Sequence, residues 1–235
     1  MNYKFFPLFF VLLLMSFTSL PSKTNSTKIN TTLAEENISK NVSIYNQLDA
    51  NTFAMPNFDC FNTALTGFQL LREKGLVTKN ILTLVDFSLS SNAKRLWVID
   101  LEKNVVLFHT LVAHGRNTGE EFANEFSNQA ESFKSSIGFY ATGEIYIGKH
   151  GMSLKLDGLE KGLNDKARER AVVMHGADYV SESFIKQNKR LGRSQGCPAI
   201  PVEMNEKIIS VIKNKSCLFI YHPSKSTEIL AKLNT

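Results

Sequence analysis

The stretch AVVMHGADYVSESFIKQNKRLGRSQGCP, residues 171–198, joins a short apolar run to a turn that contains glycine. The run at residues 172–174 predicts a buried strand that ends at His175, because short apolar runs between turn residues are typical of covered strands. Cys197 follows Gly196 in the turn. A thiol with an imidazole in reach is the minimum equipment of a cysteine nucleophile and its general base. The stretch therefore indicates acyl-transfer chemistry.

The turn around the cysteine has the features of a nucleophile site. Gly196 lets the chain bend sharply and lets amide groups approach a developing oxyanion. Pro198 has no amide hydrogen, so oxyanion donors are expected from Gln195, Gly196 or Cys197, with Ser194 in the same turn. A Gly-Cys-Pro tripeptide alone also fits a buried cysteine at a structural turn.

His175 is the preferred base for this thiol. A free cysteine has a pKa of about 8.5, so the thiol needs activation. A strand end would hold the His175 ring, and Gly176 leaves space beside it. Asp178 or a backbone carbonyl is expected to orient the second ring nitrogen.

The composition fits one exported domain. The chain has 235 residues, 43% of them hydrophobic, which is enough for one substantial core. Lys4 and the apolar run after it predict a signal peptide or N-terminal anchor over residues 1–21. Residues 22–56, rich in Ser, Thr and Asn, predict a flexible linker, and residues 57–235 the catalytic domain. We expect the protein in the periplasm or cell envelope, with membrane attachment only through the N-terminal segment.

Charge and ligand spacing argue against other classes of function. The net charge of +5 forms no basic block with interleaved aromatic residues, so no nucleic-acid partner is expected. His109 and His114 would face opposite sides of a strand, and no ligand-spaced cluster is present, so no metal site is expected. The cysteine number is odd. Cys60 and Cys217 resemble small buried hydrophobes, although the sequence leaves a disulfide between them open.

Periodic apolar residues predict the secondary structure. Apolar residues at steps of three and four predict a helix from Phe58 to near Gly75 and a second helix after Pro201. Residues 163–170 are a third candidate helix, and the polar segment 115–135 is expected to be a lid or binding loop. The expected strands are residues 81–87, 95–101, 104–114, 137–142, 145–148, 153–156, 171–175 and 217–221, with glycine turns at Gly143 and Gly158. The predicted fold class is mainly β, a mixed sandwich or barrel-like arrangement with peripheral α-helices.

The order of these motifs resembles a known family. His175-Gly176 followed by the run from Ser194 to Cys197 is similar to the signature of the L,D-transpeptidase catalytic domain, in which HG precedes S-H-G-C. The segment Ser136–Tyr140 resembles that family's T-P-x-G-x-[FY] motif. Flanking motifs resemble the divergent bacterial branch of murein L,D-transpeptidases, and the resemblance spans roughly residues 58–222. The chain departs from the family at Gln195, where the signature has histidine, and at Pro198-Ala199, where it has Asn or Arg.

The resemblance implies a two-step transfer on peptidoglycan stem peptides. Cys197 would attack the carbonyl after the L-centre of diaminopimelate in a tetrapeptide stem, releasing D-alanine and leaving a thioester. His175 would move the proton, and an amine acceptor would then form the cross-link. Water as acceptor would make the protein an L,D-carboxypeptidase. The missing histidine motivates a further alternative, a non-catalytic wall-binding module.

The resemblance also implies the mixed β-sandwich-like fold and a reaction without metal or organic cofactor. Arg193 and Arg116 are candidates for binding a substrate carboxylate, because a guanidinium can do so with two hydrogen bonds. Solvated surface arginines are the alternative for both. Gly176 and Tyr140 complete the set of candidate substrate-binding residues.

Overall fold

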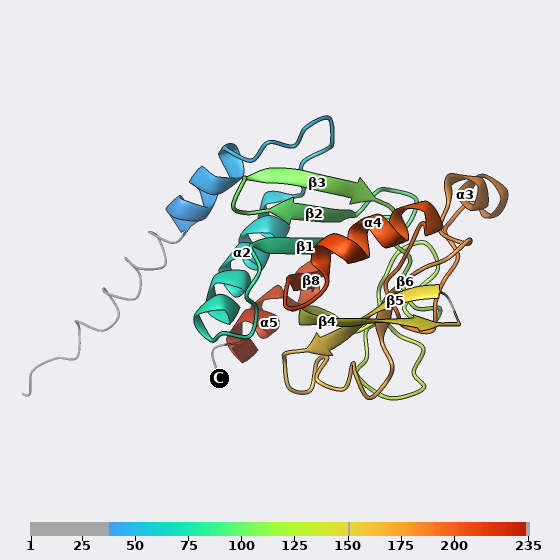
Figure 1. Cartoon of the computed structure of the whole chain (residues 1–235). Helices are drawn as coiled ribbons and strands as arrows, with labels where there is room; N and C mark the ends of the chain where they lie inside the picture. Colours follow the sequence, from blue (N-terminus) through green and yellow to red (C-terminus); the bar gives the residue numbers. More distant parts are fainter. Residues whose placement is uncertain (1–37, 150, 234–235) are drawn as a thin grey trace, which may run out of the picture. The chain divides into compact units, whose positions relative to one another are not determined.

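The computed structural model describes residues 38–149 and 151–233, which are built on one mixed eight-stranded sheet (Figure 1). The sheet order is β3-β2-β1-β8-β4-β5-β6-β7, in which β1 and β8 are parallel and β4 and β5 form an antiparallel hairpin. The strands are β1 (Ile81–Asp86), β2 (Leu96–Asp100), β3 (Val105–Thr110), β4 (Gly138–Gly148), β5 (Gly151–Gly158), β6 (Val173–Gly176), β7 (Ala199–Ile200) and β8 (Cys217–Tyr221). The helices are α2 (Phe58–Glu73), α3 (Glu182–Asn188), α4 (Val202–Ile212), α5 (Ser226–Leu233) and the 3-10 turn η1 (Pro223–Lys225). This arrangement confirms the expected fold class.

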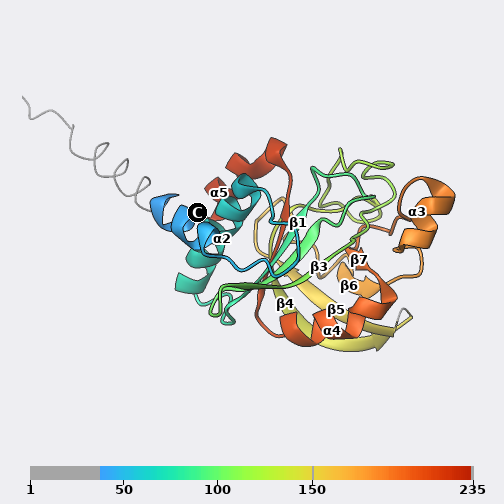
Figure 2. The same ribbon diagram turned by 90° about the horizontal axis from the view of Figure 1, so that it is seen from above.

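The chain after β3 closes the sheet into a near-barrel. Ala113 pairs with Ala199 of β7, the last strand in the sheet order, and its amide donates to the Ala199 carbonyl at 2.8 Å. Gly115 makes a second bridge, to Ser194. The expected strand 104–114 is therefore a shorter strand followed by isolated bridges, and these bridges bring the 115–135 loop to the strand ends (Figure 2).

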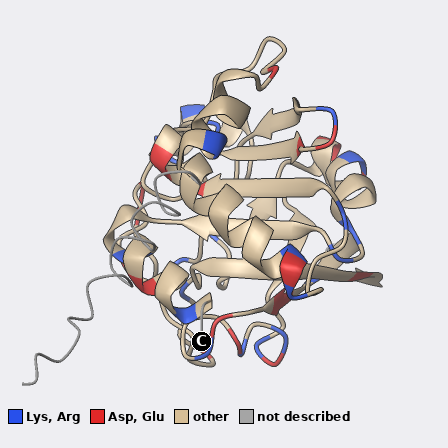
Figure 3. Ribbon diagram, turned by 90° about the vertical axis from the view of Figure 1, so that its left-hand side faces the viewer, with Lys and Arg blue, Asp and Glu red and all other residues tan. Residues whose placement is uncertain are grey.

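The two amphipathic helices supply much of the core. Phe61, Leu65 and Leu71 of α2 and Ile208 and Ile212 of α4 are all buried, as their spacing predicts. Burying one such side chain contributes roughly 1.5–3 kcal/mol. Figure 3 shows that charged residues lie mainly on helices and loops, with positive and negative ones interspersed. Among the described residues, no helix has the length and apolar character of a membrane span.

The described residues before position 57 belong to the same compact unit as the rest of the described chain. Residues 38–46 are helical, and Tyr45 packs against Phe61 with ring centroids 5.2 Å apart. Farther along, the Trp97 indole donates to the Ala54 carbonyl at 2.7 Å. The aromatic and polar anchors of this segment have no sequence period, so composition alone suggested a linker. The expected signal peptide and the start of the linker lie outside the described residues.

Two other expectations about secondary structure are wrong. Residues 163–170 form turns rather than a helix, because the amides of Leu163, Asn164 and Asp165 all bond to the Glu160 carbonyl. The expected strands 137–142 and 145–148 are one strand, β4, with a shift of register at Gly143 instead of a turn. The remaining helices and strands follow the expected positions, except that α3, α5 and β7 were not predicted.

Candidate active site

Cys197 and His175 line the same cavity, which has a volume of about 650 Å³. Residues from the 115–135 loop, the β4–β5 hairpin and the turns before β6 form its walls. Ser194, Gln195 and Arg193 also line it. The cavity therefore brings together five of the nine candidate site residues of the sequence.

The parallel pairing of β6 with β7 places the cysteine next to the histidine strand. His175 lies opposite Ala199 in this register. Cys197 precedes Ala199 by two residues and therefore lies beside Val173, whose amide is 3.4 Å from Cys197 Sγ. The pairing of β6 with β7 thus brings the motif of His175 next to the motif of Cys197.

A backbone carbonyl orients the His175 ring. His175 is 3% exposed, and its Nδ1 lies 3.0 Å from the Gly176 carbonyl oxygen. A carbonyl only accepts, so Nδ1 carries the hydrogen, and the lone pair of the neutral ring is on Nε2. Asp178, the other expected orienting group, is exposed. The tautomer suits His175 to take a proton through Nε2.

The environment of Cys197 keeps the resting thiol protonated. Burial raises the pKa of the Cys197 thiol, while the Val173 amide and the Arg170 charge act in the opposite direction. The Ala171 carbonyl is 3.8 Å from Sγ and receives the thiol hydrogen. A nucleophilic role of this thiol would therefore need a base to remove its proton.

The other two cysteines are poor candidates for the nucleophile. All three are free thiols, so the possible Cys60–Cys217 disulfide is absent. Cys60 and Cys217 are fully buried, and burial raises the pKa of each thiol. Neither lines the cavity that contains Cys197.

Ser194 fixes the shape of the nucleophile turn. Its hydroxyl donates to the Cys197 carbonyl at 2.6 Å and accepts from the Gly196 amide at 3.0 Å. The Gly196 φ of 122° lies in the region that favours glycine, and an added Cβ would be 2.9 Å from the Lys134 carbonyl oxygen. Gly196 thus has the expected turn role, but Ser194 already occupies the amide that we expected to serve an oxyanion.

Two amide donors of the turn remain for an oxyanion. Within the part of the chain that the structure describes, the Gln195 and Cys197 amides have no hydrogen-bond acceptor. The Gln195 side chain is exposed and lines the cavity. These two amides are the groups that can stabilise negative charge on a substrate oxygen.

Arg193 and Arg116 are engaged with the 115–135 loop. Arg193 Nη1 donates to the Glu120 carboxylate at 2.6 Å and to the Arg116 and Gly119 carbonyls at 3.2 Å each. The Arg116 guanidinium lies 3.9 Å from the centre of the Phe133 ring. In this structure Arg193 therefore holds the 115–135 loop through Glu120 and two carbonyls, and its part in binding a substrate carboxylate stays a prediction.

Gly176 and Tyr140 are not among the residues that line this cavity. The Tyr140 side chain is fully buried, and its hydroxyl donates to the Ser136 carbonyl at 3.0 Å. Gly176 packs against α4, where an added Cβ would be 3.1 Å from Asn205 Cβ. Tyr140 of β4 and Gly176 of β6 are thus packed positions of the sheet, and their role in substrate binding stays a prediction.

Arg170 is a cavity residue that the sequence did not reveal. The sequence pattern places residue 170 at the end of a candidate helix and gives it no site role. The turns that replace this helix direct its side chain into the cavity wall next to Cys197. Only the three-dimensional arrangement relates this arginine to the nucleophile.

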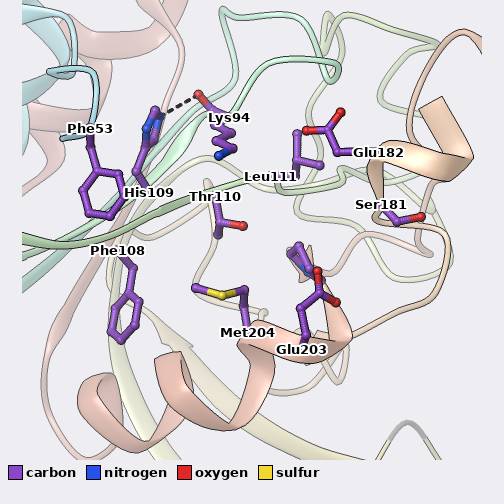
Figure 4. Close-up of a pocket in the computed structure, with 11 residues that line it drawn as sticks. Phe53, Lys94, Phe108, His109, Thr110, Leu111, Ser181, Glu182, Glu203 and Met204 are labelled. Atoms are coloured by element: carbon purple, nitrogen blue, oxygen red, sulfur yellow. Dashed lines mark hydrogen bonds between the residues drawn. The ribbon is translucent and has the colours of Figure 1, made fainter. Parts of the chain in front are cut away.

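A second cavity, of about 350 Å³, lies between β3 and the starts of α3 and α4 (Figure 4). Phe108 and Met204 form apolar walls, and Lys94, Glu182 and Glu203 bring charges to it. None of the described residues that line it is a cysteine. Of the two cavities, the larger one is therefore the one that Cys197 lines.

Comparison with known proteins identifies one family. The model of the L,D-transpeptidase catalytic domain matches residues 54–221. No curated protein matches the chain.

Several solved structures are similar to the chain. An L,D-transpeptidase from Mycobacterium smegmatis is 10% identical over 61% of this chain, with a TM-score of 0.38, and the match spans 59% of that protein. One from Xylanimonas cellulosilytica DSM 15894 is 10% identical, with 79% and 93% of the two chains covered and a TM-score of 0.35. One from Stackebrandtia nassauensis is 12% identical, with 80% and 91% covered and a TM-score of 0.36.

Proposed function

The chain belongs to the L,D-transpeptidase catalytic domain family, and we propose that it is an exported cysteine L,D-transpeptidase acting on peptidoglycan stem peptides. The observation that carries this proposal is the shared cavity of Cys197 and His175. Family membership supports a transpeptidase type of activity. The thioester on Cys197, the stem substrate and the export are our own assignments.

The first step forms the acyl-enzyme. Nε2 of His175 takes the thiol proton, and Cys197 Sγ attacks the carbonyl carbon that follows the L-centre of the donor stem. The carbonyl oxygen becomes an oxyanion, for which the Gln195 and Cys197 amides are the donors. When the C–N bond breaks, His175 returns the proton to the leaving amine. D-alanine leaves, and the stem remains bound to Sγ as a thioester.

The second step transfers the stem. An amine of a neighbouring stem or of a protein attacks the thioester, and His175 takes the amine proton. The C–S bond breaks, the proton passes to Sγ, and an amide cross-link replaces the thioester. With water as the acceptor, the same steps give an L,D-carboxypeptidase.

The departure at Gln195 is compatible with this chemistry. The family signature has histidine at that position, whereas here Gln195 is an exposed cavity residue. The proton transfers above use only His175, which is buried and held by a carbonyl. The alternative, a non-catalytic wall-binding module, would require that Cys197 and His175 line the same cavity without taking part in a reaction.

The products of one incubation test the proposal. The full chain is mixed with disaccharide tetrapeptides, with and without an added amine, and the products are identified by mass. We expect D-alanine release and cross-linked or amine-capped stems from the wild type and from Cys60→Ala, and none from Cys197→Ala. Trimmed stems alone would favour the carboxypeptidase. Retained activity in Cys197→Ala would overturn the proposal.

A further inference from the structure

Arg170 lies in a turn before β6 and lines the cavity that Cys197 also lines. The chain turns at Ala171, whose φ of 53° is in the left-handed region, and then enters β6. The Arg170 amide donates to the Lys166 carbonyl at 2.9 Å, which fixes the start of the turn. The side chain is half-buried and lines the catalytic cavity.

The Arg170 guanidinium fastens the 127–136 segment. Nη1 donates to the Ser127 carbonyl at 2.8 Å and to Ser136 Oγ at 2.5 Å. Nη2 donates to the Lys134 carbonyl at 2.8 Å and to Ser132 Oγ at 3.3 Å. One side chain thus makes hydrogen bonds to four residues of a loop that has no regular secondary structure of its own.

The 127–136 loop contacts the turn that contains Gly196 and Cys197. Ser135 Oγ donates to the Gly196 carbonyl at 3.1 Å and accepts from the Gly115 amide at 3.0 Å. A Cβ added to Gly196 would lie 2.9 Å from the Lys134 carbonyl oxygen and 3.5 Å from Arg170 Nη2. The guanidinium, the loop and the residue before Cys197 are therefore in close contact.

The guanidinium also acts on the thiol by its charge. The positive charge of Arg170 lowers the pKa of Cys197, against the larger effect of burial. None of its bonds is to a carboxylate, since every acceptor is a carbonyl or a hydroxyl. Within residues 38–149 and 151–233, its charge is therefore not neutralised by a direct ion pair.

We propose that Arg170 is a positioning residue of this site, which holds the 127–136 loop against the Gly196-Cys197 turn and supplies a positive charge that favours the Cys197 thiolate. The effect of Arg170 on the rate of stem transfer rests on the proposed function, whereas the effect of Arg170 on the reactivity of the Cys197 thiol does not. The other charged or titratable groups that line the cavity with Arg170 and Cys197 are His175, Tyr146, Tyr179, Arg193, Lys149, Glu131 and Glu169. Among them, Arg193 is held by Glu120.

Alkylation of Cys197 by iodoacetamide as a function of pH tests this role. The full chain is compared with Arg170→Met, Arg170→Lys and a matched control, Arg168→Met, whose side chain is paired with Asp157 and Glu144. Alkylation is read at Cys197 by peptide mass. We expect Arg170→Met to alkylate roughly 3- to 10-fold more slowly near pH 7, as the thiolate fraction falls when the pKa rises by up to about one unit.

The lysine variant separates charge from geometry. Arg170→Lys keeps the positive charge but loses the guanidinium, which makes four hydrogen bonds to the loop. We therefore expect its alkylation rate to depend on pH nearly as in the wild type, and residues 127–136 to be cleaved faster by a protease. If Arg170→Met folds poorly, the comparison of Arg170→Lys with Arg168→Met still tests the loop. Wild-type alkylation and wild-type protection in both Arg170 variants would overturn the proposal. If Arg170→Met is alkylated more slowly, as expected, but the wild type releases no D-alanine, the role of Arg170 stands and the proposed function is contradicted.

Discussion

The Ser194 hydroxyl donates a 2.6 Å hydrogen bond to the carbonyl oxygen of Cys197. The Ser194 hydroxyl oxygen also accepts a hydrogen bond from the Gly196 amide at 3.0 Å, so this one side chain bonds to both residues that follow Gln195 in the turn. Breaking this arrangement leaves polar groups of the turn unpaired, which costs about 1–3 kcal/mol. The Ser194 bonds therefore set the direction of the free Gln195 and Cys197 amides.

Replacing Ser194 tests this relationship. We expect Ser194→Ala to lower the rate of D-alanine release by roughly 10- to 100-fold, which corresponds to the free energy of the lost bonds. Ser194→Thr keeps the hydroxyl and should restore most of the rate. Ser183→Ala, on the exposed helix α3, is the control. Equal rates in Ser194→Ala and the wild type would contradict the role of the turn.

Replacing His175 tests the base. We expect His175→Asn to reduce the rate of acyl transfer by about 10²- to 10⁴-fold, because a positioned general base contributes that much. Residual activity should increase with pH, since hydroxide replaces the base as the thiol ionises. The measurement is the pH profile of D-alanine release, with His109→Asn, outside the catalytic cavity, as the control. An unchanged profile would show that another group takes the proton.

Arg193 is expected to matter for the loop rather than for substrate affinity. Arg193→Met removes the bond to Glu120 and both carbonyl contacts, so the 115–135 loop should be cleaved faster by a protease. Glu120→Gln, which removes only the charged partner, should show a smaller effect in the same direction. A large rise in KM for the stem with unchanged loop protection would instead favour a carboxylate clamp.

Glu160 is expected to make stability depend on pH. Burial raises the pKa of Glu160 to about 8, whereas an unfolded glutamate has a pKa of about 4.3. The folded carboxyl keeps its proton between these values and the unfolded one does not. Its contribution to the free energy of unfolding is complete below pH about 4.3 and is lost as the pH rises to about 8.

Denaturant unfolding at several pH values measures this contribution. Glu160→Gln cannot titrate, so its free energy of unfolding should fall less than that of the wild type between pH 5 and pH 8, whatever its absolute stability. Glu131→Gln, at an exposed position, is the control and should follow the wild type. Parallel curves for Glu160→Gln and the wild type would contradict the assignment.

Much of the fold could be predicted because its elements bury apolar residues at regular spacing. Helix α2 and strand β8 are examples, since their burial follows the pattern of Phe61 and Leu65 and of the run 217–221. The helix expected at residues 163–170 was wrong because Glu160 and Asn164 form a buried polar network with β4 there. Such a network depends on contacts between segments that sequence periodicity does not contain.

The site was predictable only where its residues form local motifs. Cys197, His175 and Ser194 lie in short motifs, and the structure brings them to one cavity. Arg170 has an ordinary sequence context, and its role depends on a loop about 40 residues earlier in the chain. The contact of Arg193 with Glu120 could not be predicted either, because Glu120 belongs to a distant loop.

The central claim is that Cys197 carries the stem as a thioester. The most direct test is the intact mass of the full chain, mixed briefly with disaccharide tetrapeptide and quenched in acid, followed by peptide mapping. We predict an adduct with the mass of the stem less D-alanine, located on Cys197, removed by hydroxylamine and absent from Cys197→Ser. Release of D-alanine with no adduct on Cys197, or with the adduct on Cys60 or Cys217, would contradict the account.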